Sequence, residues 1–331
     1  MNMSDRFTFG VLTYNQEKEV IATLNSIKYQ VEQYGSGYSC RLIITDDCSK
    51  DNTVLSCRKW LEENKGLFED YEIKTNKNNV GTVKNYNYIL DKIDDHPFKI
   101  IAGDDLIAHN NIFASAALNN KHTLFCGFKL MFRGTDLVVY NDDIFRQFYL
   151  IKKKKRTKDK NLSLLKMGFV ISTPQTLYSK ELYDISGAKE FNSTFRLFED
   201  NPTWYCMLKN VNDIVLEFAE YPIVIYRLSE KSVSNATVKV NTVFQTELSK
   251  LYDTYMREGT LFDRLYFTSI KKGRPKFLNL SKNVNKFFRL KCRLYAYLNR
   301  KEFLEYKNKL ESVLDVEKKH LNRLLELEEN R

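Results

Sequence analysis

The 331-residue sequence contains little glycine and even less proline, with 12 and 5 residues respectively. This scarcity excludes collagen-like and low-complexity chains, which need these residues in bulk. Long apolar runs are also absent, and the longest, such as Leu42–Thr45 and Leu137–Tyr140, have the length of a strand. A membrane-spanning helix needs about 20 consecutive apolar residues. The first ten residues include Asp5 and no long apolar stretch, so we expect no secretory signal.

Metal-binding patterns of cysteine and histidine are absent as well. The six cysteines form no C-x-x-C pair, and the four histidines are scattered, which argues against a zinc site. Without a secretion signal, the cysteines are expected to be reduced thiols in a cytoplasmic protein. Neither G-x-G-x-x-G nor G-x-x-x-x-G-K-[ST] occurs. The dinucleotide fingerprint and the P-loop are therefore excluded as phosphate-binding devices.

The net charge of +10 is concentrated in one segment. Residues 271–301 contain 11 lysines and arginines and no acid, so the other 300 residues sum to −1. A neutral body with paired acids argues against nucleic acid as a partner. Apolar residues recur at helical spacing between the basic ones, as in a helix that lies on an anionic membrane or packs on the protein. These residues are Val284, Phe287, Phe288, Cys292 and Tyr295.

Strand and helix patterns alternate through the first hundred residues. Short apolar runs predict strands, and stretches with one apolar face predict the helices between them. Such alternation implies an α/β fold with a mostly parallel sheet and helices on both faces. The predicted strands are 7–12, 41–45, 71–75 and 98–102, and the predicted helices run from Asn15 to Gln33, over 53–64 and over 83–93.

The rest of the chain divides into two parts. The middle, about 114–227, is less regular, with hairpin-like strands at 124–132 and 137–140, a polybasic loop at 152–160 and a helix after Asp200. From about residue 236 the pattern is helical and polar. We therefore predict an α/β domain over residues 1–235 and a basic helical extension over 236–331. The last helical stretch could pair two subunits through Leu310, Val313, Leu314, Leu321, Leu324 and Leu325.

A polar cluster follows each predicted strand of the first part. Because parallel sheets bind ligands beyond the carboxyl ends of their strands, the four clusters are expected to meet at one edge. Two of them contain adjacent carboxylates, Asp46-Asp47 and Asp104-Asp105. In the absence of a phosphate-binding loop, a diphosphate would need a cation, and carboxylate oxygens suit Mg²⁺ or Mn²⁺. The other clusters are Thr13-Tyr14-Asn15 and Asn78-Asn79-Val80-Gly81.

Six stretches resemble the successive signatures of family 2 glycosyltransferases with the GT-A fold, a Rossmann-like α/β fold. The resemblance covers roughly residues 7–234, about two thirds of the chain, in the order and spacing of that family. It implies a metal-dependent enzyme that moves a sugar from a nucleotide-diphosphate donor to an acceptor hydroxyl. The stretches are FGVLTYNQEKEVIATLNSI, IITDDCSKDNT, NNVGTVKNYNYIL, IIAGDDL, ISTPQTLYSKELYDISGAKEF and LFEDNPTWYCMLKN.

The resemblance also assigns residues to the donor site. Thr13 and Asp47 would hold the nucleobase, which in this family is usually uracil. Asp104 would face the ribose, and Asp105 would bind the metal. Asp46-Asp47 also fits a turn that caps a helix. For Lys84, the alternative is a side chain that contacts only water. Further candidates around the donor are Tyr14, Asn15, Glu17 and Lys84.

The resemblance implies that Asp200, in the Glu199-Asp200 pair, is the base of an inverting displacement. An acceptor hydroxyl must lose its proton as it attacks the anomeric carbon, and a carboxylate within reach can accept that proton. The alternative is that the two acids only complement the dipole of the helix that follows.

One feature departs from the family. Many relatives carry a histidine shortly after a Tyr-Arg pair, where it helps to hold the metal or the diphosphate. Here Ser229 takes that position, and no histidine occurs between His122 and His320. Arg227 and Lys231 are then the candidates to neutralise the diphosphate, since both can make charge-assisted hydrogen bonds to phosphate.

A cytoplasmic enzyme with a basic helical segment suggests a capsule or O-antigen glycosyltransferase that acts on a lipid-linked oligosaccharide at the inner face of the cell membrane. Other functions remain as alternatives. A nucleotidyltransferase would carry a glycine-rich basic loop near its N-terminus, and residues 12–19 lack one. Extension of a protein-linked glycan is a second alternative. A non-catalytic assembly subunit is a third, and the retention of Asp47, Asp105 and Asp200 argues against it.

Overall fold

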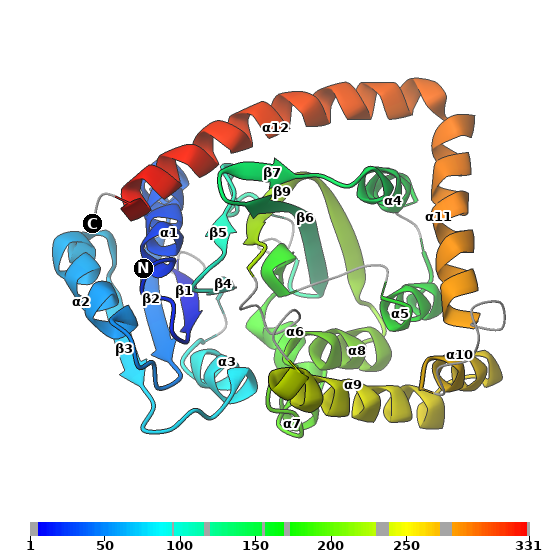
Figure 1. Ribbon diagram of the computed structural model, residues 1–331, viewed down its shortest axis with the longest axis horizontal. Helices are drawn as coiled ribbons and strands as arrows, with labels where there is room; N and C mark the ends of the chain where they lie inside the picture. Colours follow the sequence, from blue (N-terminus) through cyan, green and yellow to red (C-terminus); the bar gives the residue numbers. More distant parts are fainter. Residues whose placement is uncertain are drawn as a thin grey trace.

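A computed structural model describes residues 6–94, 96–115, 120–153, 156–168, 173–229, 238–271 and 280–329. Its first sheet has four parallel strands in the order β3-β2-β1-β4 (Figure 1). All four predicted strands are present, each within two residues of its expected ends. They are β1 (Arg6–Thr13), β2 (Ser39–Asp46), β3 (Asp70–Thr75) and β4 (Phe98–Ala102).

Helices cover both faces of this sheet. α1 (Val20–Tyr34) and α2 (Thr53–Asn64) pack on one face, against the buried side chains of β1 on either side of Gly10. α3 (Thr82–Leu90) packs on the other face, where a Cβ atom at Gly10 would lie 2.8 Å from Cγ2 of Ile89. The alternation of side chains along each strand produces this division. The three helices predicted between the strands are thus confirmed.

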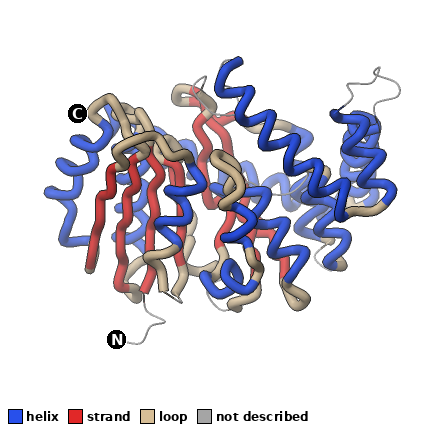
Figure 2. Tube along the Cα trace, turned by 90° about the horizontal axis from the view of Figure 1, so that it is seen from below, coloured by secondary structure: helices blue, strands red, loops and turns tan. Residues whose placement is uncertain are grey.

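A second sheet of five strands lies beside the first (Figure 2). Its β6–β7 hairpin confirms the predicted one, but the sequence does not predict β9. Pro222 lies inside β9, where proline is rare, and the register with β6 shifts beside Phe128, opposite this proline. β6 (Thr123–Arg133) runs parallel to β9 (Val215–Arg227) and antiparallel to β7 (Asp136–Val138) and β8 (Thr176–Leu177), and β5 (Leu106–Ile107) runs antiparallel to β9.

The middle of the chain contains more helix than the sequence predicts. One helix ends at Lys152 and the next begins at Lys158, so the polybasic connection is shorter than the loop predicted over 152–160. The hydroxyl of Thr157 accepts a hydrogen bond from the backbone N–H of Lys160 (3.3 Å) and caps the second helix. The helices are α4 (Asn141–Lys152), α5 (Lys158–Lys166), α6 (Lys180–Ile185), α7 (Ala188–Asn192) and α8 (Asp200–Asn210), with 3₁₀ turns at Lys65–Leu67 and Thr173–Gln175.

The C-terminal helices run around the second sheet and return to the first (Figure 1). The last of them packs on α1, and its Leu310, Leu321 and Leu324 are buried within the chain. The apolar stripe that could have paired two subunits is therefore part of the core. No helix in the described parts is long and apolar enough to cross a membrane. The helices are α9 (Val238–Glu258), α10 (Leu261–Lys271), α11 (Leu280–Leu298) and α12 (Arg300–Glu329).

A buried carboxylate anchors α12 to the loop that follows β5. Glu317 is fully buried and accepts hydrogen bonds from the backbone N–H of His109 (3.0 Å) and from Nδ2 of Asn110 (2.8 Å). Burial raises the pKa of Glu317 to about 7. One turn further on, burial lowers the pKa of His320 to about 4. The contact of α12 with β5 and the loop after it therefore depends on two groups that are costly to charge.

We expect Glu317→Gln to stabilise the protein more at pH 7 and above than at pH 4.5. Between the ordinary pKa of 4.5 and about 7, the folded protein holds a proton on Glu317 that the unfolded chain releases. The native protein therefore loses stability as the pH rises through this window, by on the order of 3 kcal/mol. Urea unfolding of both proteins across this pH range measures the difference between their free energies of unfolding. The titration of His320 is common to both proteins and does not contribute to that difference. A difference that does not change with pH would contradict the assignment.

Candidate active site

The loops after β1 and β2 are joined by hydrogen bonds through Asn15. Its backbone N–H donates to Oγ of Ser49 (2.8 Å), and its Oδ1 accepts from the backbone N–H of Lys50 (2.8 Å). Asn15 has a φ of 53°, a left-handed conformation that asparagine adopts more readily than most residues. Of the other donor candidates, Tyr14 is 47% exposed and Lys84 is exposed on the first turn of α3.

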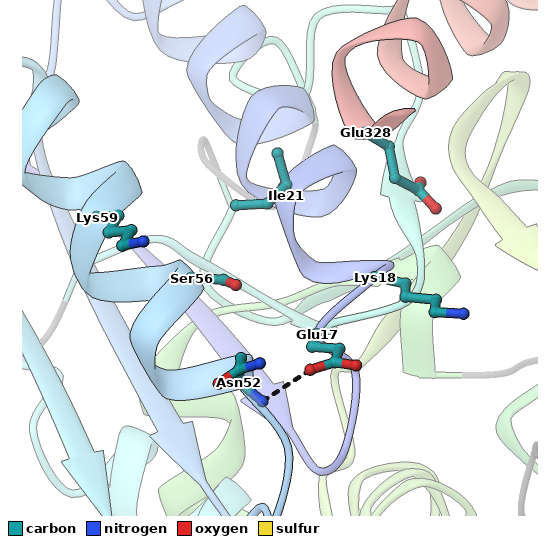
Figure 3. A pocket seen from close by; sticks show the side chains of 7 residues that line it. All are labelled: Glu17, Lys18, Ile21, Asn52, Ser56, Lys59 and Glu328. Atoms are coloured by element: carbon teal, nitrogen blue, oxygen red, sulfur yellow. Dashed lines mark hydrogen bonds between the residues drawn. The ribbon is translucent and has the colours of Figure 1, made fainter. Parts of the chain in front are cut away.

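Glu17 joins the same two loops. Its backbone N–H donates to Oδ2 of Asp51 (3.1 Å), and its Oε2 accepts from the backbone N–H of Asn52 (2.9 Å) at the start of α2 (Figure 3). The structure thus gives Glu17 a role in holding the loops. Glu17 also lines a cavity of about 500 Å³, together with Lys18, Ile21, Asn52, Ser56, Lys59 and Glu328 (Figure 3).

The adjacent acids at the end of β2 tie the neighbouring loops to this strand. Asp46 is buried and accepts a hydrogen bond from the hydroxyl of Thr13 (3.1 Å). Asp47 accepts from the backbone N–H groups of Val80 (2.7 Å) and Gly81 (2.9 Å), and Gly81 has a φ of 91° that favours glycine. The structure therefore brings the first three predicted polar clusters together at one edge of the sheet.

The fourth cluster, Asp104-Asp105, is tied to the end of β9. Oδ1 of Asp105 accepts a hydrogen bond from the backbone N–H of Arg227 (3.0 Å), and the carbonyl of Asp104 accepts from Nε of Arg227 (3.0 Å). The carbonyl of Asp105 accepts from the hydroxyl of Thr23 on α1 (2.8 Å). The acidic pair is therefore oriented by β9 of the second sheet and by α1, which packs on the first sheet.

Both acids of this pair are costly to ionise. Burial raises the pKa of Asp105 well above its ordinary value, and the neighbouring Asp104 raises it further. Burial also raises the pKa of Asp104. A divalent cation would stabilise the charged forms, so the pair fits one chemically. No cluster of three or more histidine, cysteine or acidic ligands occurs among the described residues.

Arg227 also connects the acidic pair to the C-terminal helix. Its guanidinium forms an ion pair with Glu328 of α12 (2.7 Å) and lies over the ring of Phe132 (4.7 Å to the centroid). The end of α12 is thus part of the surroundings of the site, which the sequence did not indicate. Ser229 follows β9, and Lys231, the second predicted diphosphate residue, lies outside the described residues.

Lys129 on β6 interacts electrostatically with two of the predicted site residues, and no motif indicated it. Burial lowers its pKa, whereas the carboxylates of Asp105, Asp143 and Asp200 act in the opposite direction. Its Nζ lies 4.8 Å from the ring centroid of Tyr226 on β9. A single ammonium group therefore interacts with both the predicted metal ligand and the predicted base. The signal in the sequence is a lysine inside an otherwise apolar strand, TLFCGFKLMFR.

The predicted base lies at the start of α8. Burial raises the pKa of Asp200, and the charge of Lys129 acts against this rise. Glu199, which precedes α8, interacts electrostatically with the buried Tyr178. Asp200 is thus the member of the pair that shares Lys129 with Asp105. A carboxylate whose pKa is raised is a better proton acceptor than an ordinary aspartate.

The parallel sheet, its helices and the helical C-terminal region define a mixed α/β enzyme with the GT-A fold, as the resemblance implied. Residues 8–184, just over half of the chain, match the sequence profile described as Glycosyl transferase family 2. The chain belongs to this family, and it is a glycosyltransferase. No curated protein sequence matches it.

Solved structures of glycosyltransferases are similar in fold. The mannosyltransferase PcManGT from Pyrobaculum calidifontis, in complex with GDP-Man and Mn²⁺, is 14% identical with a TM-score of 0.54, over 98% of this chain and 85% of that one. S. aureus TarS 1–349 in complex with UDP is 16% identical with a TM-score of 0.49, over 80% and 79%. A longer TarS structure is 16% identical with a TM-score of 0.48, over 82% of this chain and 50% of its own length. The chain therefore spans about half of the longer TarS structure.

Proposed function

We propose that this protein is an inverting glycosyltransferase that moves a sugar from a UDP-sugar to an acceptor hydroxyl. The observation that carries the proposal is that the carboxylates of Asp105, in the loop between β4 and β5, and of Asp200, at the start of α8, both act to raise the pKa of Lys129. One acid is suited to a cation at the donor, and the other is suited to accept a proton. A nucleotide-sugar donor also agrees with the GDP-Man that PcManGT holds.

Each protein group has a separate task in this mechanism. Asp105, with Asp104 beside it, would hold Mg²⁺ or Mn²⁺, which when bound stabilises charge on the leaving diphosphate. The backbone N–H of Arg227 orients Asp105. Asp200 accepts the proton of the acceptor hydroxyl as its oxygen attacks the anomeric carbon. Attack from the side opposite the leaving group inverts the configuration of the sugar.

Thermal unfolding in the presence of nucleotide sugars tests the donor. A donor present at 100 times its Kd stabilises the folded protein by about 2.7 kcal/mol. We expect UDP-sugars to raise the midpoint with Mg²⁺ or Mn²⁺ and to raise it less with a chelator. A rise with GDP-sugars but not with UDP-sugars would overturn the choice of donor. No rise with any nucleotide sugar would count against the enzyme as a whole.

For the acceptor, we propose a lipid-linked oligosaccharide at the inner face of the cell membrane, in the synthesis of a capsule or O-antigen polysaccharide. The support is the basic segment of residues 271–301, which suits an anionic lipid surface. Incubation of the enzyme with donor and either lipid-linked or free oligosaccharides tests this choice. We expect the lipid-linked form to be glycosylated faster, and the opposite preference would contradict it.

Metal binding is expected to be weak without the donor and markedly stronger with it. The described residues offer an acidic pair rather than a cluster of three ligands, so the donor diphosphate must supply further oxygens. Arg227 is the described candidate to neutralise that diphosphate, and its replacement by alanine should slow transfer more than it weakens nucleoside binding. Calorimetric titration of Mn²⁺ with and without the nucleotide sugar measures the coupling. Tight binding to the donor-free protein would show that a further ligand exists.

Lys129→Met is expected to shift the acid limb of the pH–rate profile to higher pH. The charge of Lys129 counteracts the burial that raises the pKa of Asp200, so its loss leaves the base protonated at a higher pH. The expected shift in the profile of kcat/KM is about one pH unit, in line with a nearby charge of opposite sign. Lys129→Arg, which keeps the charge, should restore the profile. A lower rate with an unchanged profile would indicate a purely structural role.

A further inference from the structure

Helix α11 has two apolar faces, and only one of them packs on the protein. Phe288, Cys292 and Ala296 are buried, and the ring of Phe288 meets that of Tyr149 on α4 at 5.8 Å between centroids. Most of the apolar residues that recur at helical spacing in this segment therefore belong to the inner face. The segment therefore packs on the protein through one of its faces.

The opposite face carries large apolar side chains in contact with water. Their spacing of three, four, three and one residues places them along one side of the helix. More than half of each side chain is exposed, which is unusual for so many large apolar residues on one helix. This outer stripe consists of Phe287 (70%), Leu290 (62%), Leu294 (54%), Tyr297 (73%) and Leu298 (72%).

Basic residues border the outer stripe on both sides. At roughly 100° per residue, Lys286 and Arg293 fall along one edge and Lys291 along the other. Arg293 and Arg289 also pair with Asp142 of α4, at 2.7 and 3.4 Å, and so hold the inner face in place. Lys286 and Lys291 are exposed. The stripe thus has the composition of a helix that lies in a membrane interface, with cations at its margins.

We propose that the outer stripe of α11 docks the enzyme on a bilayer surface rich in anionic phospholipids, with the apolar side chains among the acyl chains and Lys286 and Lys291 at the phosphates. The inference rests on the proposed function in one respect, that the acceptor is lipid-linked. Charge complementarity favours lipid over a second copy, because residues 271–301 carry +11. Two copies that met through this face would bring like charges together.

Co-sedimentation of the full chain with vesicles tests the proposal without any donor. We expect binding to vesicles of phosphatidylglycerol and phosphatidylcholine at low salt, and weak binding to phosphatidylcholine alone. Lys286→Gln with Lys291→Gln should weaken the partition about 30-fold, at the usual worth of two lysines near an anionic surface. Neither lysine contributes to the ion pairs of α11 with Asp142. Because Nζ of Lys291 lies 5.3 Å from the ring centroid of Tyr149 on α4, the melting temperature of this variant is measured to show that the helix stays in place.

The apolar contribution is tested by Leu290→Ser with Leu294→Ser. We expect this pair to weaken the partition at least about tenfold, since both side chains would leave the acyl region. Leu55→Ser with Tyr71→Ser is the matched control, because these residues are 49% and 45% exposed on α2 and β3. The control should bind vesicles as the unmodified protein does. The melting temperature of each variant, with and without nucleotide sugar, shows that the fold and the donor site are intact.

Several results would overturn the proposal. Failure of the unmodified protein to bind anionic vesicles at low salt would do so directly. Unchanged binding by the Leu290/Leu294 variant would mean that another surface meets the lipid. A dimer that this variant abolishes would mean that a second copy covers the stripe. Because vesicle binding is measured without donor, these outcomes are independent of any failure of the proposed transfer reaction.

Discussion

Asp105→Asn is expected to reduce sugar transfer by about 10²–10⁴-fold and to remove most of its dependence on Mg²⁺ or Mn²⁺. The loss corresponds to the several kcal/mol that a positioned cation contributes to charge stabilisation in a transition state. Asparagine keeps an Oδ1 that can accept the hydrogen bond from the backbone N–H of Arg227. The substitution therefore removes the negative charge while the contact with β9 can remain. Initial rates over a series of metal concentrations measure the effect.

A matched control distinguishes loss of the metal from loss of the fold. Asp263 is also buried, at 6% exposure, and pairs with Lys166 at 3.0 Å, away from the acidic pair. Asp263→Asn should lower the free energy of unfolding because it leaves a buried lysine unpaired. Its transfer reaction should keep the metal requirement of the unmodified protein. Full activity of Asp105→Asn with an unchanged metal requirement would show that this acid is not the ligand.

Asp200→Asn is expected to lower the rate of the chemical step by on the order of 10²–10⁴-fold, with little change in donor affinity. The reason is that an amide cannot accept the proton of the acceptor hydroxyl. The backbone N–H of Asn201 donates to Oδ1 of Asp200 (2.6 Å), and an asparagine oxygen can accept the same bond. The start of α8 should therefore remain intact. Single-turnover rates and nucleotide-sugar binding, measured on the same preparation, separate the two effects.

Glu199→Gln is the comparison that decides between the adjacent acids. Glu199 interacts with the buried Tyr178, whereas Asp200 interacts with Lys129. We expect Glu199→Gln to affect stability more than the chemical rate. If Glu199→Gln lowers the chemical rate and Asp200→Asn does not, the base has been assigned to the wrong residue.

Much of the first sheet follows from local patterns in the sequence. Apolar runs of strand length alternate with helical faces, and this period alone predicts parallel strands with helices between them. The polar residues after each strand, from Thr13 to Asp105, were expected at one edge because parallel strands end on the same side. The structure confirms the strands and brings these clusters together through bonds such as those from Val80 and Gly81 to Asp47.

Other parts of the site depend on contacts between distant segments, which no local pattern encodes. Arg227 contacts Asp105, which lies 122 positions away in the chain. Arg227 belongs to β9, a strand that is hard to predict from the sequence because it contains a proline. The ammonium group of Lys129 is another example, because β6 places it where carboxylates from three other segments of the chain act on it.

The two apolar faces of α11 show the same division between sequence and structure. The sequence by itself determined that residues 280–298 form a basic amphipathic helix, since helical periodicity is a property of neighbouring residues. Only the tertiary structure decided that Phe288 and Cys292 face α4 while Phe287 and Leu290 face water. The same holds for α12, whose leucines could equally have met a second subunit. Burial depends on which surfaces meet in space, and a single chain carries more apolar faces than its own core can accommodate.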